Sequence, residues 1–205
     1  VDVSGSRNFG TLSQMKRDMM AEVAATLAFS TIANNDKVGV IFFSDKIEKY
    51  IPAKKGKTHV LHIIRELLSF EPQSTGTNIA QALQYFANAQ KRHCTTFLIS
   101  DFIDAGNMYQ PLMIASNRHE VNAIQIYDRR EAELPNVGLI KFHDAETGKD
   151  IWIDTAITSV RNNYAQAWRD NQDTIQQLFT RTGVDHVSIR TDEDYVKALM
   201  HLFRC

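Results

Sequence analysis

Residues 38–43, Val38-Gly39-Val40-Ile41-Phe42-Phe43, form a short run that is almost wholly apolar. A run of this kind is typical of a strand in a parallel sheet, where crossover helices cover both faces. Two further runs, 95–99 and 121–127, have the same character. The three runs therefore predict buried strands, and a weaker run at 187–189 predicts another.

Helical periodicity fills the intervals between these runs. In residues 11–33 the apolar positions recur every four residues, and charged residues fill the other face of the helix: Met15, Met19, Val23 and Leu27 against Lys16, Arg17, Asp18 and Glu22. Further helices are predicted near 58–70, 79–86, 109–118 and 157–181, and a last one, capped by Asp192, ends at Phe203. Because strands and helices alternate, we expect a doubly wound α/β fold with a mostly parallel sheet flanked by helices.

Two smaller elements complete the expected fold. Residues 46–52 predict a small edge element, and residues 138–143 and 150–154 flank a turn at Gly148, which predicts an inserted β-hairpin over 138–154. No linker long enough to separate domains is apparent, so residues 1–205 are expected to form a single domain. Val1 and Asp2 resemble the end of a buried strand, so we expect the sequence to be a fragment with a truncated first strand.

Composition excludes several classes of function. The 205 residues include 23 basic and 24 acidic side chains, so no global positive field favours nucleic acid or anionic lipid. The apolar runs are far shorter than the roughly 20 residues of a membrane-spanning helix. Cys94 and Cys205 cannot form a disulfide framework, which favours a reducing, cytoplasmic location, although a parent protein could be membrane-tethered.

Polar residues gather where three predicted loops leave the carboxyl side of the sheet. Asp2, Ser4 and Ser6 follow the first strand with the spacing Asp-x-Ser-x-Ser, Thr77 precedes a helix, and Asp101 follows the strand at 95–99. Open α/β sheets bind ligands beyond the carboxyl ends of their strands, where the strand order reverses. Three hydroxyls and two carboxylates are hard oxygen ligands, which favour Mg²⁺, with Mn²⁺ or Ca²⁺ as alternatives.

These segments resemble the metal-ion-dependent adhesion site of von Willebrand factor A domains. The resemblance implies the fold of these domains, a Rossmann-like three-layer sandwich that integrin I domains share. The resemblance lies in Asp2-Val3-Ser4-Gly5-Ser6, Gly76-Thr77 and Ser100-Asp101. More narrowly, residues 35–45, 51–52 and 54–56 resemble the bacterial subfamily commonly encoded beside MoxR-type AAA+ ATPases. The resemblance implies that Ser4, Ser6 and Thr77 bind the metal directly and that Asp2 and Asp101 act largely through water.

The resemblance also implies a function. A metal held by neutral hydroxyls can accept an acidic side chain from another protein, so the expected function is a non-enzymatic, Mg²⁺-dependent protein-binding module, with a MoxR-type AAA+ ATPase as the implied partner. Two alternatives stay open: a Mg²⁺-dependent phosphohydrolase, and a scaffold whose metal site is vestigial. Because Asp2 and Asp101 would repel each other without a cation, we also expect Asp101→Asn to leave the metal-free domain no less stable.

Other polar and aromatic residues carry weaker expectations. The seven histidines lack the spacing of metal ligands and are expected to lie on the surface or to pack. Asp45 is expected to be a turn residue. Trp152 and Trp168 are expected to pack, and an exposed Trp152 would be a candidate partner contact.

Overall fold

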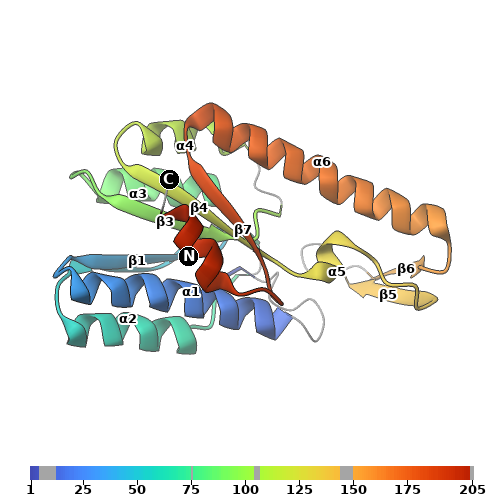
Figure 1. Ribbon diagram of the computed structural model, residues 1–205, viewed down its shortest axis with the longest axis horizontal. Helices are drawn as coiled ribbons and strands as arrows, with labels where there is room; N and C mark the ends of the chain where they lie inside the picture. Colours follow the sequence, from blue (N-terminus) through green and yellow to red (C-terminus); the bar gives the residue numbers. More distant parts are fainter. Residues whose placement is uncertain (5–12, 75, 104–106, 144–149, 204–205) are drawn as a thin grey trace.

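The computed structural model describes residues 1–4, 13–74, 76–103, 107–143 and 150–203 of the chain. Helices and strands alternate along most of it (Figure 1). In order, the elements are α1 (Ser13–Ala33), β1 (Val38–Phe43), β2 (Ile47–Lys54), α2 (Lys57–Ser69), α3 (Ile79–Ala89), β3 (Thr95–Ser100), α4 (Tyr109–Ser116), β4 (Glu120–Tyr127), α5 (Arg129–Ala132), β5 (Leu139–His143), β6 (Asp150–Asp154), α6 (Thr158–Thr182), β7 (Asp185–Arg190) and α7 (Tyr195–Leu202).

The parallel part of the sheet has three strands in the order β3-β4-β7. Their registers place Thr95 opposite Glu120 and Asn122 opposite Asp185, so the strands end together at one edge. Strand β1 differs from the expectation, because its long partner is β2 and the two run antiparallel. A Cβ atom on Gly39 would lie 2.8 Å from the backbone of β2, which explains why glycine occupies this position in the strand.

The first three residues connect β1 with β3 through backbone hydrogen bonds. On one side the amide of Val3 donates to the Phe43 carbonyl at 2.8 Å, and Asp2 forms a parallel bridge with Phe43. On the other side the amide of Asp2 donates to the Ile99 carbonyl at 2.9 Å. Strands β1 and β2 thus lie on one side of this segment, and β3, β4 and β7 lie on the other. Residues 1–3 therefore lie where the order of the strands reverses.

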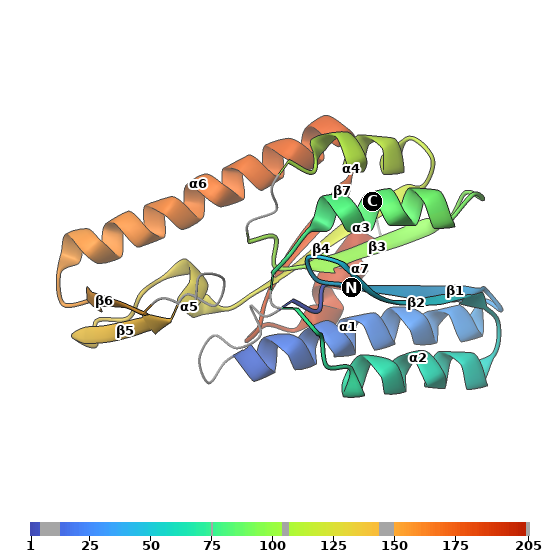
Figure 2. The same ribbon diagram turned by 180° about the vertical axis from the view of Figure 1, so that it is seen from behind.

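Helices cover both faces of this arrangement, which gives three layers (Figure 1, Figure 2). One core cluster joins α1, α2 and α7 to the strands through residues such as Val23, Ile63 and Leu199. The other joins α3, α4 and α6 to the opposite face through residues such as Leu83 and Phe179. The mixed α/β class with a flanked parallel sheet is therefore confirmed.

Residues 129–143 and 150–157 form an extension beyond the sheet. Both views show α5 and the β5–β6 pair beside the N-terminal half of α6, which continues past the strands (Figure 1, Figure 2). Strands β5 and β6 pair antiparallel, with Ile140 opposite Ile153. The expected turn at Gly148 lies outside the described residues, and the status of the pair as an insertion stays a prediction.

Two local expectations need correction. Helix α7 is capped by Asp194, whose carboxylate accepts a hydrogen bond from the Val196 amide, and not by Asp192. Asp192 instead pairs with Arg190 at the end of β7. Helix α5 was not expected, because its four residues are too few to show a helical period.

Candidate metal centre

Asp2 is buried at the point where the strand order reverses, with 5% of its surface exposed. Its Oδ1 accepts a hydrogen bond from the Ser4 amide at 2.9 Å, and its Oδ2 accepts one from Ser100 Oγ at 2.6 Å. The alternation of side chains in extended backbone places Asp2 and Ser4 on the same side of the segment. Both carboxylate oxygens are therefore held by donors from two neighbouring strand ends.

Asp101 directly follows β3 and is also buried. Its Oδ1 accepts a hydrogen bond from the Ile103 amide at 3.1 Å, and its backbone carbonyl accepts one from Gln125 Nε2 at 3.0 Å. The next residue, Phe102, has a φ of 56°, a left-handed conformation that is rare for a bulky side chain. Its ring packs edge-on against Phe179. The tight turn and the buried ring fix the direction of the Asp101 carboxylate.

Lys16 reaches this carboxylate from helix α1. Its Nζ lies 2.8 Å from Asp101 Oδ2 and 2.5 Å from Glu131 Oε1, and only 2% of the Lys16 side chain is exposed. The expectation that Lys16 lies on the charged, outer face of its helix is therefore wrong. Lys16 shares its helical face with the buried residues Met20, Val23 and Leu27.

Glu131 connects the ammonium group to helix α5 and to the end of β4. Its other oxygen, Oε2, accepts a hydrogen bond from the Asp128 amide at 2.8 Å, as part of a capping box. The Asp128 carboxylate in turn accepts one from Thr191 Oγ1, just after β7. Side chains at the ends of β3, β4 and β7 thus belong to one polar network.

The electrostatics of this network favour an additional positive charge. Burial raises the pKa of Asp2, and the nearby Asp101 carboxylate raises it further, whereas hydrogen bonds from Ser100 and Ser4 oppose the rise. Burial alone would lower the pKa of Lys16, but Asp101 and Glu131 outweigh it and the pKa is raised. Lys16 is therefore charged at neutral pH, and its ammonium group contacts two of the three buried carboxylic acids, Asp101 and Glu131 but not Asp2.

The structure describes two of the three other sequence-predicted ligands, Ser4 and Thr77. Ser4 is buried beside Asp2, and its side chain is hydrogen-bonded to the Asp2 carboxylate. Thr77 is half-buried in the loop before α3, and this loop is tied to the end of β1 by a hydrogen bond from the Asn78 amide to the Ser44 carbonyl. Ser6 lies outside the described residues. The structure thus brings Asp2, Ser4 and Asp101 together and places the Thr77 loop at the neighbouring strand end.

A hydrated divalent cation fits the donors that are present. All four carboxylate oxygens of Asp2 and Asp101 already accept a hydrogen bond from the protein, so contact through water suits them better than direct coordination. Direct ligation would then fall to the hydroxyls of Ser4 and Thr77, which are hard neutral oxygens. Among the described residues, no group of three or more His, Cys, Asp or Glu side chains is arranged to bind a metal by itself.

Sequence reasoning missed Lys16 and Glu131 as members of this site, and it gave Ser100 no role beyond its place in the Ser100-Asp101 segment. A signal for Lys16 was present, because it precedes Met20 by four positions and Val23 by seven, which is the spacing of one helical face. Glu131 gave a weaker signal: it follows Asp128 by three positions, as in a capping box. Nothing in the local sequence indicates that Glu131 approaches Lys16 across 115 positions.

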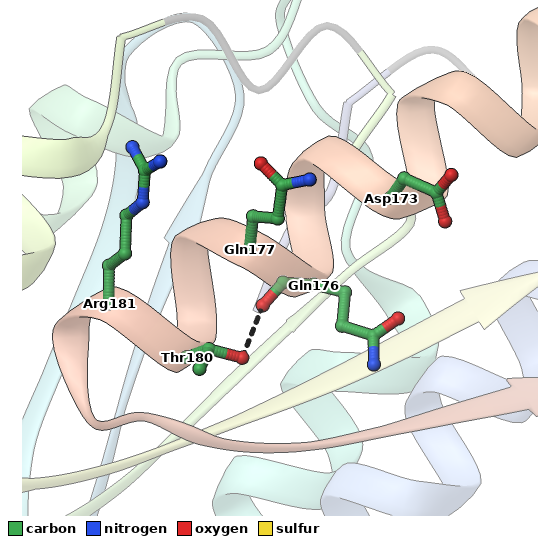
Figure 3. A pocket seen from close by; sticks show the side chains of 5 residues that line it. All are labelled: Asp173, Gln176, Gln177, Thr180 and Arg181. Carbon is green, nitrogen blue, oxygen red and sulfur yellow. Dashed lines mark hydrogen bonds between the residues drawn. The ribbon is translucent and has the colours of Figure 1, made fainter.

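A concave region lies on helix α6, away from the metal centre in sequence, and has the character of open surface. Asp173, Gln176, Gln177, Thr180 and Arg181 line it, and all five are exposed on this one helix (Figure 3). The hydrogen bond drawn there runs from Thr180 Oγ1 to the Gln176 carbonyl, within the helix. Within the part of the chain that the structure describes, no other element contributes a side chain to this region, so we do not treat it as a site.

Comparisons with known proteins give a family and a fold. A family model described as "Protein of unknown function DUF58" matches residues 1–174. The uncharacterized protein Rv1480 of Mycobacterium tuberculosis is 30% identical over 200 residues, which cover 96% of this chain and 62% of that protein. The chain thus spans less than two thirds of the length of this relative.

Two crystal structures have the same overall fold. One is an aerotolerance-related membrane protein from Bacteroides fragilis, with a TM-score of 0.60 and 16% identity over 100% of this chain and 96% of that one. The other is the conserved hypothetical protein BatB from Bacteroides thetaiotaomicron, with a TM-score of 0.52 and 16% identity over 90% of this chain and 86% of that one. At such low identity, these similarities concern the fold alone. Among the helices that the structure describes, none is both long and apolar enough to cross a membrane.

Proposed function

Because this chain belongs to the DUF58 family of proteins of unknown function, its role has to be inferred from its site, and we propose that it is a metal-dependent protein-binding module. In this proposal, Mg²⁺ is held at the carboxyl ends of the central strands and recognises an acidic side chain of a partner protein. The finer fold assignment is a von Willebrand factor A domain with an adhesion site formed by Asp2, Ser4, Ser6, Thr77 and Asp101.

One observation carries this proposal. Asp2 and Asp101 are both buried at adjacent strand ends, close enough for the charge of Asp101 to raise the pKa of Asp2. Burying two carboxylic acids side by side is costly unless a cation or hydrogen bonds compensate. Lys16 compensates Asp101 directly, and a cation between Asp2 and the hydroxyl groups would compensate Asp2. The position where the strand order reverses is also the usual ligand site of open α/β sheets.

The chemistry of the donors supports binding to a protein rather than catalysis. With neutral hydroxyls as direct ligands, a bound Mg²⁺ keeps its attraction for a further carboxylate, which an Asp or Glu of another protein can supply. Catalysis of phosphate ester hydrolysis would require a nucleophile and a general acid or base beside the metal. Lys16, the basic group nearest to Asp101, is bound to two carboxylates.

The proposed partner is a MoxR-type AAA+ ATPase, on the basis of the resemblance of residues 35–45, 51–52 and 54–56 to the subfamily encoded beside such ATPases. Since that partner uses ATP, we place this domain in the cytoplasm. The longer relative and the membrane protein with a similar fold are compatible with a parent that is tethered to a membrane.

Binding measurements with the parent protein and its genomic-neighbour ATPase test the proposal. The complex should form in Mg²⁺, dissociate in chelator, and be weakened at least tenfold by Thr77→Ala. Thr180→Ala, the same change on the exposed surface of α6, is the matched control and should have no effect. Binding that is unchanged by chelator and by Thr77→Ala would overturn the proposal, and Mg²⁺-dependent turnover of a generic phosphate ester would favour the hydrolase instead.

A further inference from the structure

We infer that Lys16 is the resident cation of this site in the metal-free protein, and that a divalent cation displaces its ammonium group from Asp101. This inference rests on the proposed cation site and describes how that site is regulated. It is based on the position of buried Lys16 between two buried carboxylates. One is Asp101, beside Asp2, and the other is Glu131 on helix α5.

The first argument is the position of Lys16. Lysine is almost never fully buried without a partner, because its ammonium group loses its hydration. Lys16 is 2% exposed and is anchored in the core through its own helical face, next to Met20. Its Nζ is therefore shielded from water in this conformation, and among the described residues Asp101 and Glu131 match its charge. A lysine placed in this way acts as a fixed monovalent cation.

The second argument concerns competition for Asp101. A divalent cation held at Asp2 through its waters also attracts the Asp101 carboxylate, and it is repelled by the Lys16 ammonium 2.8 Å from Asp101 Oδ2. A unit charge a few ångströms away changes a binding equilibrium of this kind by about 10- to 1000-fold. Lys16 should thus weaken divalent-ion binding by at least about tenfold, and it should lose contact with Asp101 when the ion binds.

The third argument is that Glu131 remains an ion-pair partner for Lys16 after the contact with Asp101 is lost. Glu131 Oε1 lies 2.5 Å from Nζ, and Glu131 Oε2 is fixed by the Asp128 amide, so this carboxylate keeps its position when Asp101 is released. The ammonium group can therefore leave Asp101 without becoming unpaired. Glu131 thus links the cation site to helix α5.

Calorimetric titration with Mg²⁺ tests the inference on wild-type protein and on Lys16→Met, which keeps the length of the side chain and removes its charge. The expected result is Mg²⁺ affinity at least tenfold tighter in Lys16→Met. Lys49→Met is the matched control, because it also removes an ion pair, the one between Lys49 on β2 and Glu66 on α2, which includes neither Asp101 nor Glu131. This control should bind Mg²⁺ with unchanged affinity.

The outcomes separate the inference from the proposed function. If wild-type protein binds Mg²⁺ and Lys16→Met binds no more tightly, the inference is overturned and the proposed function stands. If wild-type protein fails to bind Mg²⁺ but Lys16→Met binds it, Lys16 occupies the site and the proposed function fails. If neither binds, both are wrong.

Two further measurements cover the case in which Lys16→Met does not fold. The double variant Lys16→Met with Glu131→Gln removes both charges of one ion pair together. It should bind Mg²⁺ more tightly than the wild-type protein, but with a smaller gain than Lys16→Met, because Glu131 attracts the ion. In the wild-type protein, the side-chain Nζ and Cε resonances of Lys16 should shift as Mg²⁺ is added, whereas those of Lys49 should not. Resonances of Lys16 that stay unchanged at saturating Mg²⁺ contradict displacement.

Discussion

The ammonium group of Lys16 lies 2.8 Å from Oδ2 of Asp101, so a helix on one face of the sheet supplies the counter-charge of a carboxylate at the end of β3. This contact changes what is expected of Asp101. The sequence suggested that Asp101 is destabilising without a metal, whereas the structure pairs it with a buried cation. Asp2, in contrast, is held by hydrogen bonds from Ser4 and Ser100, and no lysine or arginine of the described residues forms an ion pair with it.

Asp101→Asn and Asp2→Asn should therefore have different effects on stability in the absence of metal. Asp101→Asn leaves buried Lys16 with one carboxylate and should lower the free energy of unfolding by about 3 kcal/mol. Asp2→Asn removes a repulsive charge and keeps an oxygen for the Ser4 amide, so it should change stability by less than about 1 kcal/mol. Urea unfolding in chelator measures both. Equal losses for the two variants would show that Lys16 contributes little to the stability of Asp101.

Glu131 should stabilise the folded domain, because its buried carboxylate contacts both the Lys16 ammonium group and the Asp128 amide. Glu131→Gln places an amide against the ammonium group and should cost about 3 kcal/mol of unfolding free energy. The control is Glu133→Gln on the same segment, where the side chain is 69% exposed and the loss should stay within about 0.5 kcal/mol. Thermal or urea unfolding distinguishes the two, and a Glu131→Gln variant as stable as the control would exclude a buried ion pair.

The stability of the domain should fall in mild acid because of His119. Burial lowers the pKa of this imidazole below its ordinary value of 6.5, and His93 and Arg118 add to the effect. In the unfolded chain the imidazole keeps its ordinary pKa, so the unfolded state takes up a proton first as the pH falls. The stabilising contribution is complete above pH 6.5 and is lost as the pH falls towards the lower pKa of the folded state.

Urea unfolding at pH 7.5 and pH 5.5 tests this sign. His119→Phe, next to the ring of Phe86, should reduce the loss of stability between the two pH values. His62→Gln, in which the replaced side chain is 48% exposed, should leave the loss unchanged. A domain that becomes more stable at pH 5.5 through His119 would contradict the assignment.

The two tryptophans should differ in their access to solvent. Trp152 on β6 is 63% exposed, whereas Trp168 on α6 packs against the ring of Tyr127. Acrylamide should quench the fluorescence of Trp168→Phe strongly, because that variant retains only Trp152, and it should quench Trp152→Phe weakly. Trp152→Phe should also change the unfolding free energy by less than about 0.5 kcal/mol. Weak quenching of Trp152 would indicate that another surface covers the β5–β6 pair.

Much of the fold could be predicted because apolar runs and helical periods are properties of neighbouring residues. The runs at 38–43 and 95–99 formed β1 and β3, as predicted. The direction of β2 was not predicted, although only three residues separate Phe43 from Ile47, which is too short a connection for a parallel crossover. The length of the loop between β1 and β2, rather than the composition of the strands, therefore indicates that they pair antiparallel.

The candidate site could be predicted only in part, for a physical reason. Asp2, Ser4 and Asp101 follow strands, and strand ends meet at one edge of a sheet, so their proximity follows from topology. Lys16 and Glu131 reach the same place from helices, through long side chains, and a charged residue on a helix usually faces water. The helical periodicity of α1 places Lys16 on the buried face, but its charge led to the prediction that it lies on the outer face.

The most direct test of the central claim is anomalous diffraction from crystals of this domain grown with Mn²⁺, which replaces Mg²⁺ and scatters anomalously. The account predicts one strong peak among Ser4, Thr77, Asp2 and Asp101, with the ammonium group of Lys16 withdrawn from Asp101 towards Glu131. A peak absent from this position at saturating Mn²⁺, with Lys16 still in contact with Asp101, would contradict it.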